Sequence, residues 1–291
     1  MNNEPLDASI FDYVKEFCNE DFEGILAGII ECYYSIVSKK TLLPPNDENY
    51  IRDIIVYRYL QNSKFRNKHP PLCYYQFDPE TIERGGRGDI RALSVIPYID
   101  GSAYYIIECK RLDNIKQNGI SGLNGNYISE GIDRFVSKAY PFFKKTSGML
   151  GFVVSKMDIE KNIDSINVLL SNYPSANTQQ ELNKKQIIPK FKFSYCSSHI
   201  VDNENKYIYH LMFDFSDQTE FIASCLEDFK TLRKMTRKDV NILFKKYDVY
   251  DYINFCYETL HTMNGFAIVD NITVYIENKK KDKQDKKICK Y

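Results

Sequence analysis

The apolar residues of the chain fall into segments of helical and of strand-like spacing, and the first of these is helical. Over residues 7–38 apolar side chains recur three or four positions apart, which predicts one helix broken near Asn19, or two helices. Pro44 and Pro45 follow this segment and cannot continue a helix. We interpret the segment as a helical addition that serves packing.

A second helix is predicted over residues 47–60. Asn46 is placed to be its N-cap, and the acidic first turn suits the positive end of the helix dipole. Glu48 lies on the edge of the apolar stripe that contains Ile51 and Ile55, so its carboxylate is expected to point towards the protein.

Three strand-like runs follow this helix. Residues 72–77 are predicted to form a first strand, which leads into a glycine-rich turn. Residues 89–96 and 101–110 are predicted to form a hairpin whose loop consists of residues 97–100.

The next segments alternate between helix and strand. Residues 130–140 and 158–170 are predicted to be helices, and residues 149–155 form a nearly continuous apolar strand between them. A strand on each side of a helix predicts a parallel crossover, so the fold class is α/β, with a central mixed β-sheet flanked by helices. A polar loop over residues 117–126 is either a flap over a substrate or an ordinary surface loop.

A polar connection over residues 171–190 leads into a predicted hairpin of residues 190–201 and 207–215. His199 and His210 could face each other across this hairpin, as in a two-histidine metal site. No third ligand lies within sequence range, so histidines that serve as hydrogen-bonding groups are favoured.

Helical spacing returns after residue 216. Residues 219–234, 237–247 and 251–261 are predicted to be helices, and residues 267–276 are strand-like. We therefore divide the chain into an N-terminal helical segment, an α/β core, a mainly helical extension and a lysine-rich tail predicted to be disordered, at residues 1–44, 45–216, 217–276 and 277–291.

Three charged residues stand at the ends of the hairpin strands near residue 100. The predicted register places Asp89 opposite Glu108, and Lys110 shares the same face of the second strand. Charged side chains are disfavoured on the buried face of a strand, so this convergence predicts a functional site.

Two carboxylates about 5 Å apart at their Cβ atoms suit a hard divalent cation such as Mg²⁺. Asp89, Glu108 and the backbone carbonyl of Cys109 would bind the ion. Lys110 would orient or help to deprotonate the attacking water and balance charge in the transition state. This chemistry predicts phosphodiester hydrolysis.

The arrangement resembles the PD-(D/E)XK nuclease superfamily, the restriction-endonuclease-like fold, in which an Asp opens one strand and a Glu-x-Lys triplet closes the next. Here these residues are Asp89 and Glu108-Cys109-Lys110, and Gly88 stands where the family usually has proline. The resemblance covers roughly residues 45–155 and, at its widest, extends over the strands up to residue 215. It implies a nuclease that requires Mg²⁺ or Mn²⁺ and acts on DNA, in a role such as restriction or phage defence.

Glu48 matches the acidic residue that members of this superfamily often supply from a helix before the first strand. The alternative is that Glu48 only stabilises the helix dipole. Asp53, on another face of the same helix, is the reserve candidate for this role.

Several cations near these motifs could contact a nucleic-acid backbone. Arg134 and Lys138 lie four positions apart and would share one face of the helix 130–140. The alternative is that such cations are solvated surface residues. The full set of candidate nucleic-acid-binding residues is Arg84, Arg87, Arg111, Arg134 and Lys138.

Composition limits the possible partners and the compartment. The 39 basic and 39 acidic residues cancel, so a nucleic acid could be bound only by a local basic patch. The eight cysteines are scattered singly without a Cys-x-x-Cys pair, which argues against a zinc site and for reduced thiols in a cytoplasm. No export signal and no apolar run of membrane-spanning length is present, so no membrane is expected as a partner.

Two other interpretations remain open. The chain could be a catalytically silent nucleic-acid-binding or assembly protein on the same fold. It could also be an unrelated α/β protein or another phosphate-processing enzyme, in which Asp89 and Glu108 only form ion pairs with Lys110. A nuclease that cuts both strands normally needs two sites, so a homodimer is plausible.

Overall fold

A seven-stranded mixed sheet forms the centre of the computed structural model, which describes residues 19–41, 43–83, 86–95 and 103–220. The strand order is β1-β2-β3-β4-β7-β6-β5, with β3, β4 and β7 parallel and the other pairs antiparallel. The predicted α/β fold class with a mixed sheet flanked by helices is confirmed. The strands are β1 (Tyr75–Glu83), β2 (Gly86–Ser94), β3 (Tyr104–Leu112), β4 (Thr146–Val153), β5 (Thr178–Lys184), β6 (Ser194–Val201) and β7 (Glu204–Asp214).

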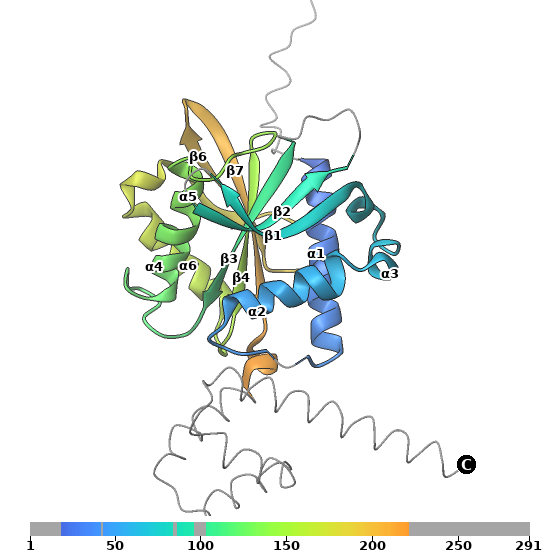
Figure 1. The fold of residues 1–291 in the computed structure, drawn as a ribbon. Helices are drawn as coiled ribbons and strands as arrows, with labels where there is room; N and C mark the ends of the chain where they lie inside the picture. The colour runs from blue at the N-terminus through green and yellow to red at the C-terminus, as the bar shows by residue number, and fades with distance from the viewer. Residues whose placement is uncertain (1–18, 42, 84–85, 96–102, 221–291) are drawn as a thin grey trace, which may run out of the picture.

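Helices cover both faces of the sheet, as Figure 1 shows. One face carries α1 (Glu20–Ser38) and α2 (Glu48–Asp53), which continues as a π-helical segment, Ile54–Leu60. The other face carries α4 (Leu123–Tyr127), the π-helical segment Ile128–Ile132, α5 (Asp133–Val136) and α6 (Ile159–Ser171). Short helical turns complete the set: α3 (Ser63–Arg66), Pro70–Tyr74 and Pro174–Ala176.

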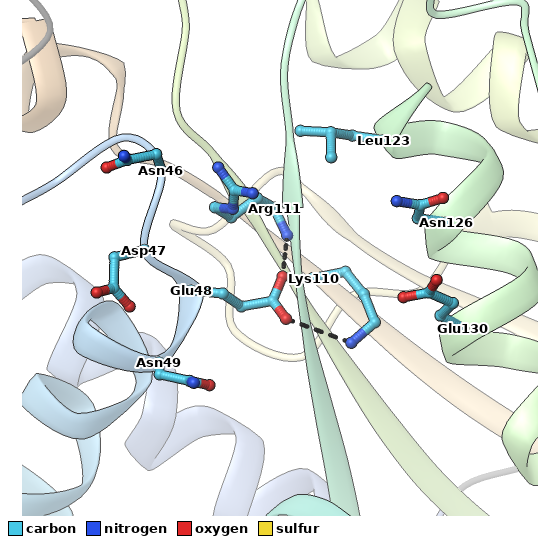
Figure 2. Close-up of a pocket in the computed structure, with 9 residues that line it drawn as sticks. All are labelled: Asn46, Asp47, Glu48, Asn49, Lys110, Arg111, Leu123, Asn126 and Glu130. Carbon is cyan, nitrogen blue, oxygen red and sulfur yellow. Dashed lines mark hydrogen bonds and ion pairs between the residues drawn. The ribbon is translucent and has the colours of Figure 1, made fainter. Parts of the chain in front are cut away.

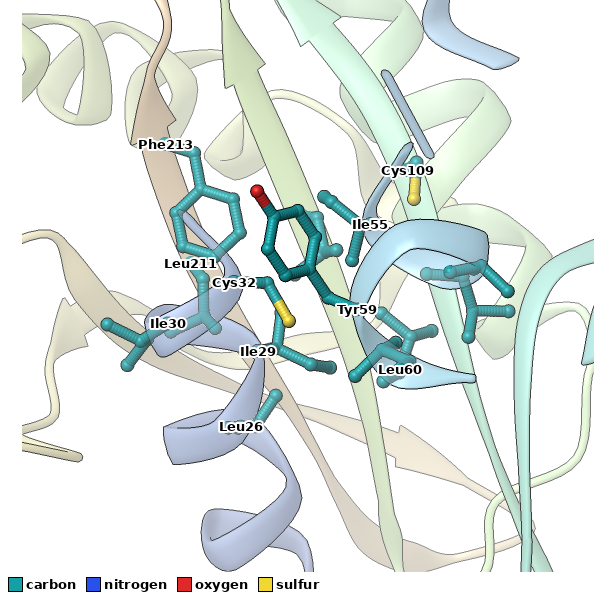
Figure 3. Packing of buried hydrophobic residues seen from close by; sticks show 14 of the residues in the cluster. Leu26, Ile29, Ile30, Cys32, Ile55, Tyr59, Leu60, Cys109, Leu211 and Phe213 are labelled. Atoms are coloured by element: carbon teal, nitrogen blue, oxygen red, sulfur yellow. The ribbon is translucent and has the colours of Figure 1, made fainter. Parts of the chain in front are cut away.

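The two faces of β3 pack into different apolar clusters. Ile107 and Cys109 join the cluster under α1 and α2, whereas Ile106 and Leu112 join the cluster under α4 and α6. Figure 3 shows Cys109 within the first cluster. Because side chains alternate along a strand, Glu108 is carried on the second, buried face. A charged residue is thus held in the interior by the strong apolar pattern on either side of it.

The structure corrects the predicted start of the sheet. Residues 70–74 form a 3₁₀ turn, and the first strand is β1, which continues through Pro79 to Glu83. The predicted strand over residues 72–77 therefore begins before β1 and ends short of Pro79. Pro79 is tolerated because β1 is an edge strand.

Several boundaries also differ from the predictions. The N-cap of α2 is Asp47, whose side chain accepts from the Tyr50 N–H, and not Asn46. The polar loop 117–126 is not wholly a surface loop, because α4 begins within it and Asn124 is buried, with its amide bonded to Asn162.

Two further predicted boundaries are wrong because the residues at these positions are mostly polar and carry no clear helix or strand pattern. The helix predicted over 130–140 begins earlier, at α4, and its last segment, α5, ends at Val136. The connection predicted over residues 171–190 contains β5, whose exposed polar sequence lacks the alternation of a half-buried strand. The elements expected after residue 220 lie outside the described residues. No helix in the described ranges is long and apolar enough to cross a bilayer.

The two histidines of the β6–β7 hairpin belong to a buried hydrogen-bond chain. His199 Nδ1 lies 2.8 Å from the carbonyl oxygen of Ala176, which can only accept, so Nδ1 carries the hydrogen. The neutral ring then accepts at Nε2 from the Ser197 hydroxyl, which itself accepts from His210 Nε2. His210 Nδ1 accepts from the Tyr127 hydroxyl at 2.8 Å.

This chain confirms that the histidines are hydrogen-bonding groups, although they do not face each other directly. The cross-strand partner of His199 is Lys206, and that of His210 is Tyr195. Burial lowers the pKa of His199 to about 4, and it holds the pKa of His210 well below its usual range.

We predict that the folded protein loses stability as the pH falls from about 6.5 towards 4. In this range the unfolded chain binds a proton at His199 that the folded chain excludes, which costs about 2 kcal/mol between pH 7 and 5. Chemical denaturation at both pH values should show a smaller difference for His199→Asn than for the wild type. The half-buried His69 provides the control: His69→Asn should leave the difference unchanged. An equal difference in His199→Asn would contradict the assignment.

Candidate functional site

β2 separates from β3 at the predicted site. Their pairing runs from Leu93↔Tyr104 to Ile90↔Ile107, and one further step in this register brings Asp89 opposite Glu108, as predicted. Beyond Ile107, β3 remains paired with β4 on its other side. The edge of β3 that faces β2 therefore presents backbone groups that bond to no other strand of the described sheet.

Two carboxylates accept hydrogen bonds from this free edge. Asp89 Oδ2 accepts from the Cys109 N–H at 2.8 Å, and Glu48 Oε2 accepts from the Arg111 N–H at 2.7 Å. Alternate residues of a strand direct their N–H groups to the same side, which explains the spacing of two. Glu48 thus points inward from the start of α2, as its position on the apolar stripe predicted (Figure 2).

Lys110 is surrounded by oxygen atoms. Its Nζ donates to Glu108 Oε1 at 2.8 Å, to the Cys109 carbonyl at 2.8 Å and to Glu48 Oε1 at 3.3 Å. Burial favours the neutral amine, but the nearby carboxylates outweigh it and raise the pKa of Lys110. Lys110 is therefore a fixed positive charge in this site.

Glu108 is the most deeply buried acid of the site, with 1% of its surface exposed. Oε1 accepts from Lys110 and, at 3.2 Å, from Arg134 Nη1, whereas Oε2 has no partner among the described residues. Burial, and then the charge of Asp89, raise the pKa of Glu108 from 4.5 to about 7. An unpartnered buried carboxylate oxygen is costly, and a catalytic role, a bound ion and a bound water are among the reasons why one persists.

The predicted nucleic-acid-binding cations take different positions. Arg134 lies inward and donates to Glu108 and to the Tyr140 hydroxyl. Lys138 does not share a helical face with it, because α5 has ended and a positive φ of 65° turns Lys138 towards Asp202.

The other predicted cations lie nearer the surface. Arg87 is 63% exposed and pairs with Glu80, and the Arg111 guanidinium donates to the Pro45 carbonyl at 2.9 Å. Arg84 lies outside the described residues. The reserve acid Asp53 pairs with Arg52, and Glu48 is the acid that contacts Lys110.

Arg52 was not predicted as a site residue, yet it donates from α2 to Asp89 Oδ1 at 3.2 Å. The spacing contained a signal, because Arg52 lies four residues after Glu48 and thus on the same side of the helix. Glu130 was also missed; it lies across a cleft from Lys110 (Figure 2).

A polar cleft of about 420 Å³ opens beside Lys110. The start of α2 forms one wall and α4 with the following π-helical segment forms the other (Figure 2). Its charged residues have both signs, so it suits a ligand that carries anionic groups together with hydrogen-bonding groups. The cleft is lined by Asn46, Asp47, Glu48, Asn49, Lys110, Arg111, Leu123, Asn126 and Glu130.

The donor set fits a hard divalent cation, provided that a backbone oxygen takes part. No three His, Cys, Asp or Glu side chains in the described ranges lie close enough together to hold a metal ion by themselves. Asp89 and Glu108 supply two carboxylates, and the Cys109 carbonyl on the free edge of β3 supplies the third oxygen. The unpartnered Oε2 of Glu108 is the observation that favours this set.

Comparison with known proteins adds one finding. A family model described as a protein of unknown function (DUF3791) matches residues 220–279, almost all of which lie outside the described ranges. No curated protein and no solved structure matches the chain. The site therefore has to be interpreted from its own geometry.

We predict that Glu108→Gln stabilises the protein in EDTA at pH 8 but not at pH 4.5. The folded state holds the carboxyl protonated up to about pH 7, so its ionisation penalty appears as the pH rises from 4.5 to 7 and remains above it. The gain should reach at most about 3 kcal/mol, because the pKa of about 7 already includes the attraction of Lys110 and Arg134 for the ionised carboxylate. Thermal melts at both pH values test this, with the exposed Glu160→Gln as control. A loss of stability at pH 8 would contradict the prediction.

Proposed function

We propose that the protein is a divalent-metal-dependent nuclease that hydrolyses phosphodiester bonds. The observation that carries the proposal is the buried Glu108, with an unpartnered oxygen, next to Asp89 and in contact with Lys110. A carboxylate with a strongly shifted pKa beside a second acid and a buried lysine is typical of a catalytic centre. The resemblance to PD-(D/E)XK nucleases in the order Asp89, Glu108, Lys110 supports the same conclusion.

The residues have distinct roles under this proposal. Asp89, Glu108 and the Cys109 carbonyl would bind Mg²⁺ or Mn²⁺, and the bound ion would supply Lewis acidity and lower the pKa of a coordinated water. Lys110 lies on the cleft side and would stabilise negative charge on the phosphate. Glu48 holds Lys110 in place through Oε1.

The substrate would be DNA bound along the polar cleft. Arg111 lines the cleft, and Arg87 is exposed on β2 two residues before Asp89, so these two cations would contact a phosphate backbone. Restriction or phage defence in a cytoplasm, by a homodimer when both strands are cut, is the biological role we associate with this activity.

A second candidate function is nucleic-acid binding without catalysis. It is favoured by the pairing of the acids with the protein's own cations: Arg52 donates to Asp89, and Lys110 donates to Glu108. The two candidates differ in whether metal binding depends on Asp89.

We predict that the protein cleaves or nicks DNA with Mg²⁺ or Mn²⁺ and is inactive in EDTA. Asp89→Asn keeps an oxygen for the Cys109 N–H but loses the charge that pairs with Arg52, so cleavage should fall by roughly 100-fold or more, measured at a temperature well below the variant's own melting point. Asp164→Asn, an exposed acid on α6, is the matched control and should keep full activity. Equal activity in EDTA would refute the metal role, and metal-independent DNA binding without cleavage would favour the second candidate.

We also predict that Lys110→Met loses most turnover but retains metal binding. An ammonium group repels a cation and acts on the water and the transition state, so its removal should leave the carboxylates able to bind the ion. Isothermal titration with Mn²⁺ and single-turnover cleavage separate the two effects, with the exposed Lys64→Met as control. A collapse of Mn²⁺ affinity in Lys110→Met would assign Lys110 a structural role instead.

A further inference from the structure

Arg52 is a buried guanidinium at the back of the site. Arg52 lies on the short helix α2, and only 3% of its side chain is exposed. Its Nε and Nη2 donate to Asp53 Oδ1 at 2.9 and 2.7 Å. Nη1 donates to Asn49 and to Asp89 Oδ1, at 3.1 and 3.2 Å, and Nη2 also donates to Glu80 Oε1 at 3.2 Å.

Two of these partners, Glu80 and Asp89, face each other where the β1–β2 pair is distorted. The pairs Pro79↔Ile90 and Thr81↔Gly88 flank Glu80 and Asp89, so these two acids oppose each other between them. Glu80 has a φ of 51°, a left-handed conformation that is strained for a residue with a side chain. Such strain persists only where surrounding contacts hold it.

Arg52 supplies contacts on both sides of this distortion. Through Glu80 it holds β1, and through Asp89 Oδ1 it holds β2, while Asp53 anchors its guanidinium to α2. The other oxygen of Asp89 is bonded to the Cys109 N–H of β3. Both oxygens of Asp89 are thus directed, one by Arg52 and one by β3.

We propose that Arg52 is a positioning residue that fixes the Asp89 carboxylate against the free edge of β3. Its relevance to catalysis rests on the proposed nuclease function, but its action on Asp89 does not. Lysine could not replace it, because the contacts use three nitrogen atoms of a planar group at once, and an ammonium offers a single nitrogen.

The test uses two variants of the full chain. Arg52→Gln removes the charge, and Arg52→Lys keeps the charge but lacks the planar fork, so it remains informative if Arg52→Gln does not fold. Arg58, exposed on the π-helical continuation of the same helix, provides the matched controls Arg58→Gln and Arg58→Lys.

Two readouts report on the position of Asp89. The first is hydrogen exchange of the Cys109 amide, followed by NMR, since this N–H is bonded to Asp89 Oδ2. We expect exchange at least roughly tenfold faster in both Arg52 variants and in Asp89→Ala, and unchanged exchange in the Arg58 variants. The second is Mn²⁺ affinity by calorimetry, which should fall by roughly 10- to 100-fold in the Arg52 variants, as for residues that orient metal ligands.

The outcomes separate this proposal from the nuclease proposal. A lower melting temperature with unchanged Cys109 exchange would show that Arg52 serves stability alone, and would overturn the positioning role. Unchanged values for both readouts and for melting would also overturn it. If the wild type shows no Asp89-dependent Mn²⁺ binding, the nuclease proposal fails, and the Cys109 amide still decides whether Arg52 positions Asp89.

Discussion

The free edge of β3 beyond Ile107 is the constraint on which the site depends. Backbone N–H groups that leave a sheet inside a protein must find another acceptor. Here Asp89 and Glu48 provide it for Cys109 and Arg111, and the two acids come from β2 and α2. The need to satisfy these two backbone donors therefore brings the carboxylates of β2 and α2 to β3, next to Glu108, which β3 itself carries.

The second constraint is electrostatic. Burying these carboxylates would cost a large desolvation free energy without cations, and guanidinium and ammonium groups donate to them in the structure. At the site, ion pairs between described residues join five acids to four cations: Glu48, Asp53, Glu80, Asp89 and Glu108 pair with Arg52, Arg87, Lys110 and Arg134. When Glu108 is ionised, above about pH 7, this set has one more negative charge than positive, which suits a site that accepts a cation.

Much of the site could be predicted because it depends on local periodicity. Strand parity placed Glu108 and Lys110 on one face, and a hairpin register placed Asp89 opposite Glu108. Helical spacing turned Glu48 inward. The errors arose where a polar sequence lies in an ordered element: β5 is a polar edge strand, and Asn124 is buried because Asn162 takes its hydrogen bonds.

The sequence by itself determined the α/β class, the mixed sheet and the identity of the central acids, because alternation and helical spacing are properties of neighbours along the chain. Only the tertiary structure decided which cation meets which acid. Arg134 was expected to face a nucleic acid but pairs with Glu108, and Arg52 reaches Asp89 across 37 positions. Long cationic side chains can reach several partners, so their pairing depends on how the elements pack and not on spacing.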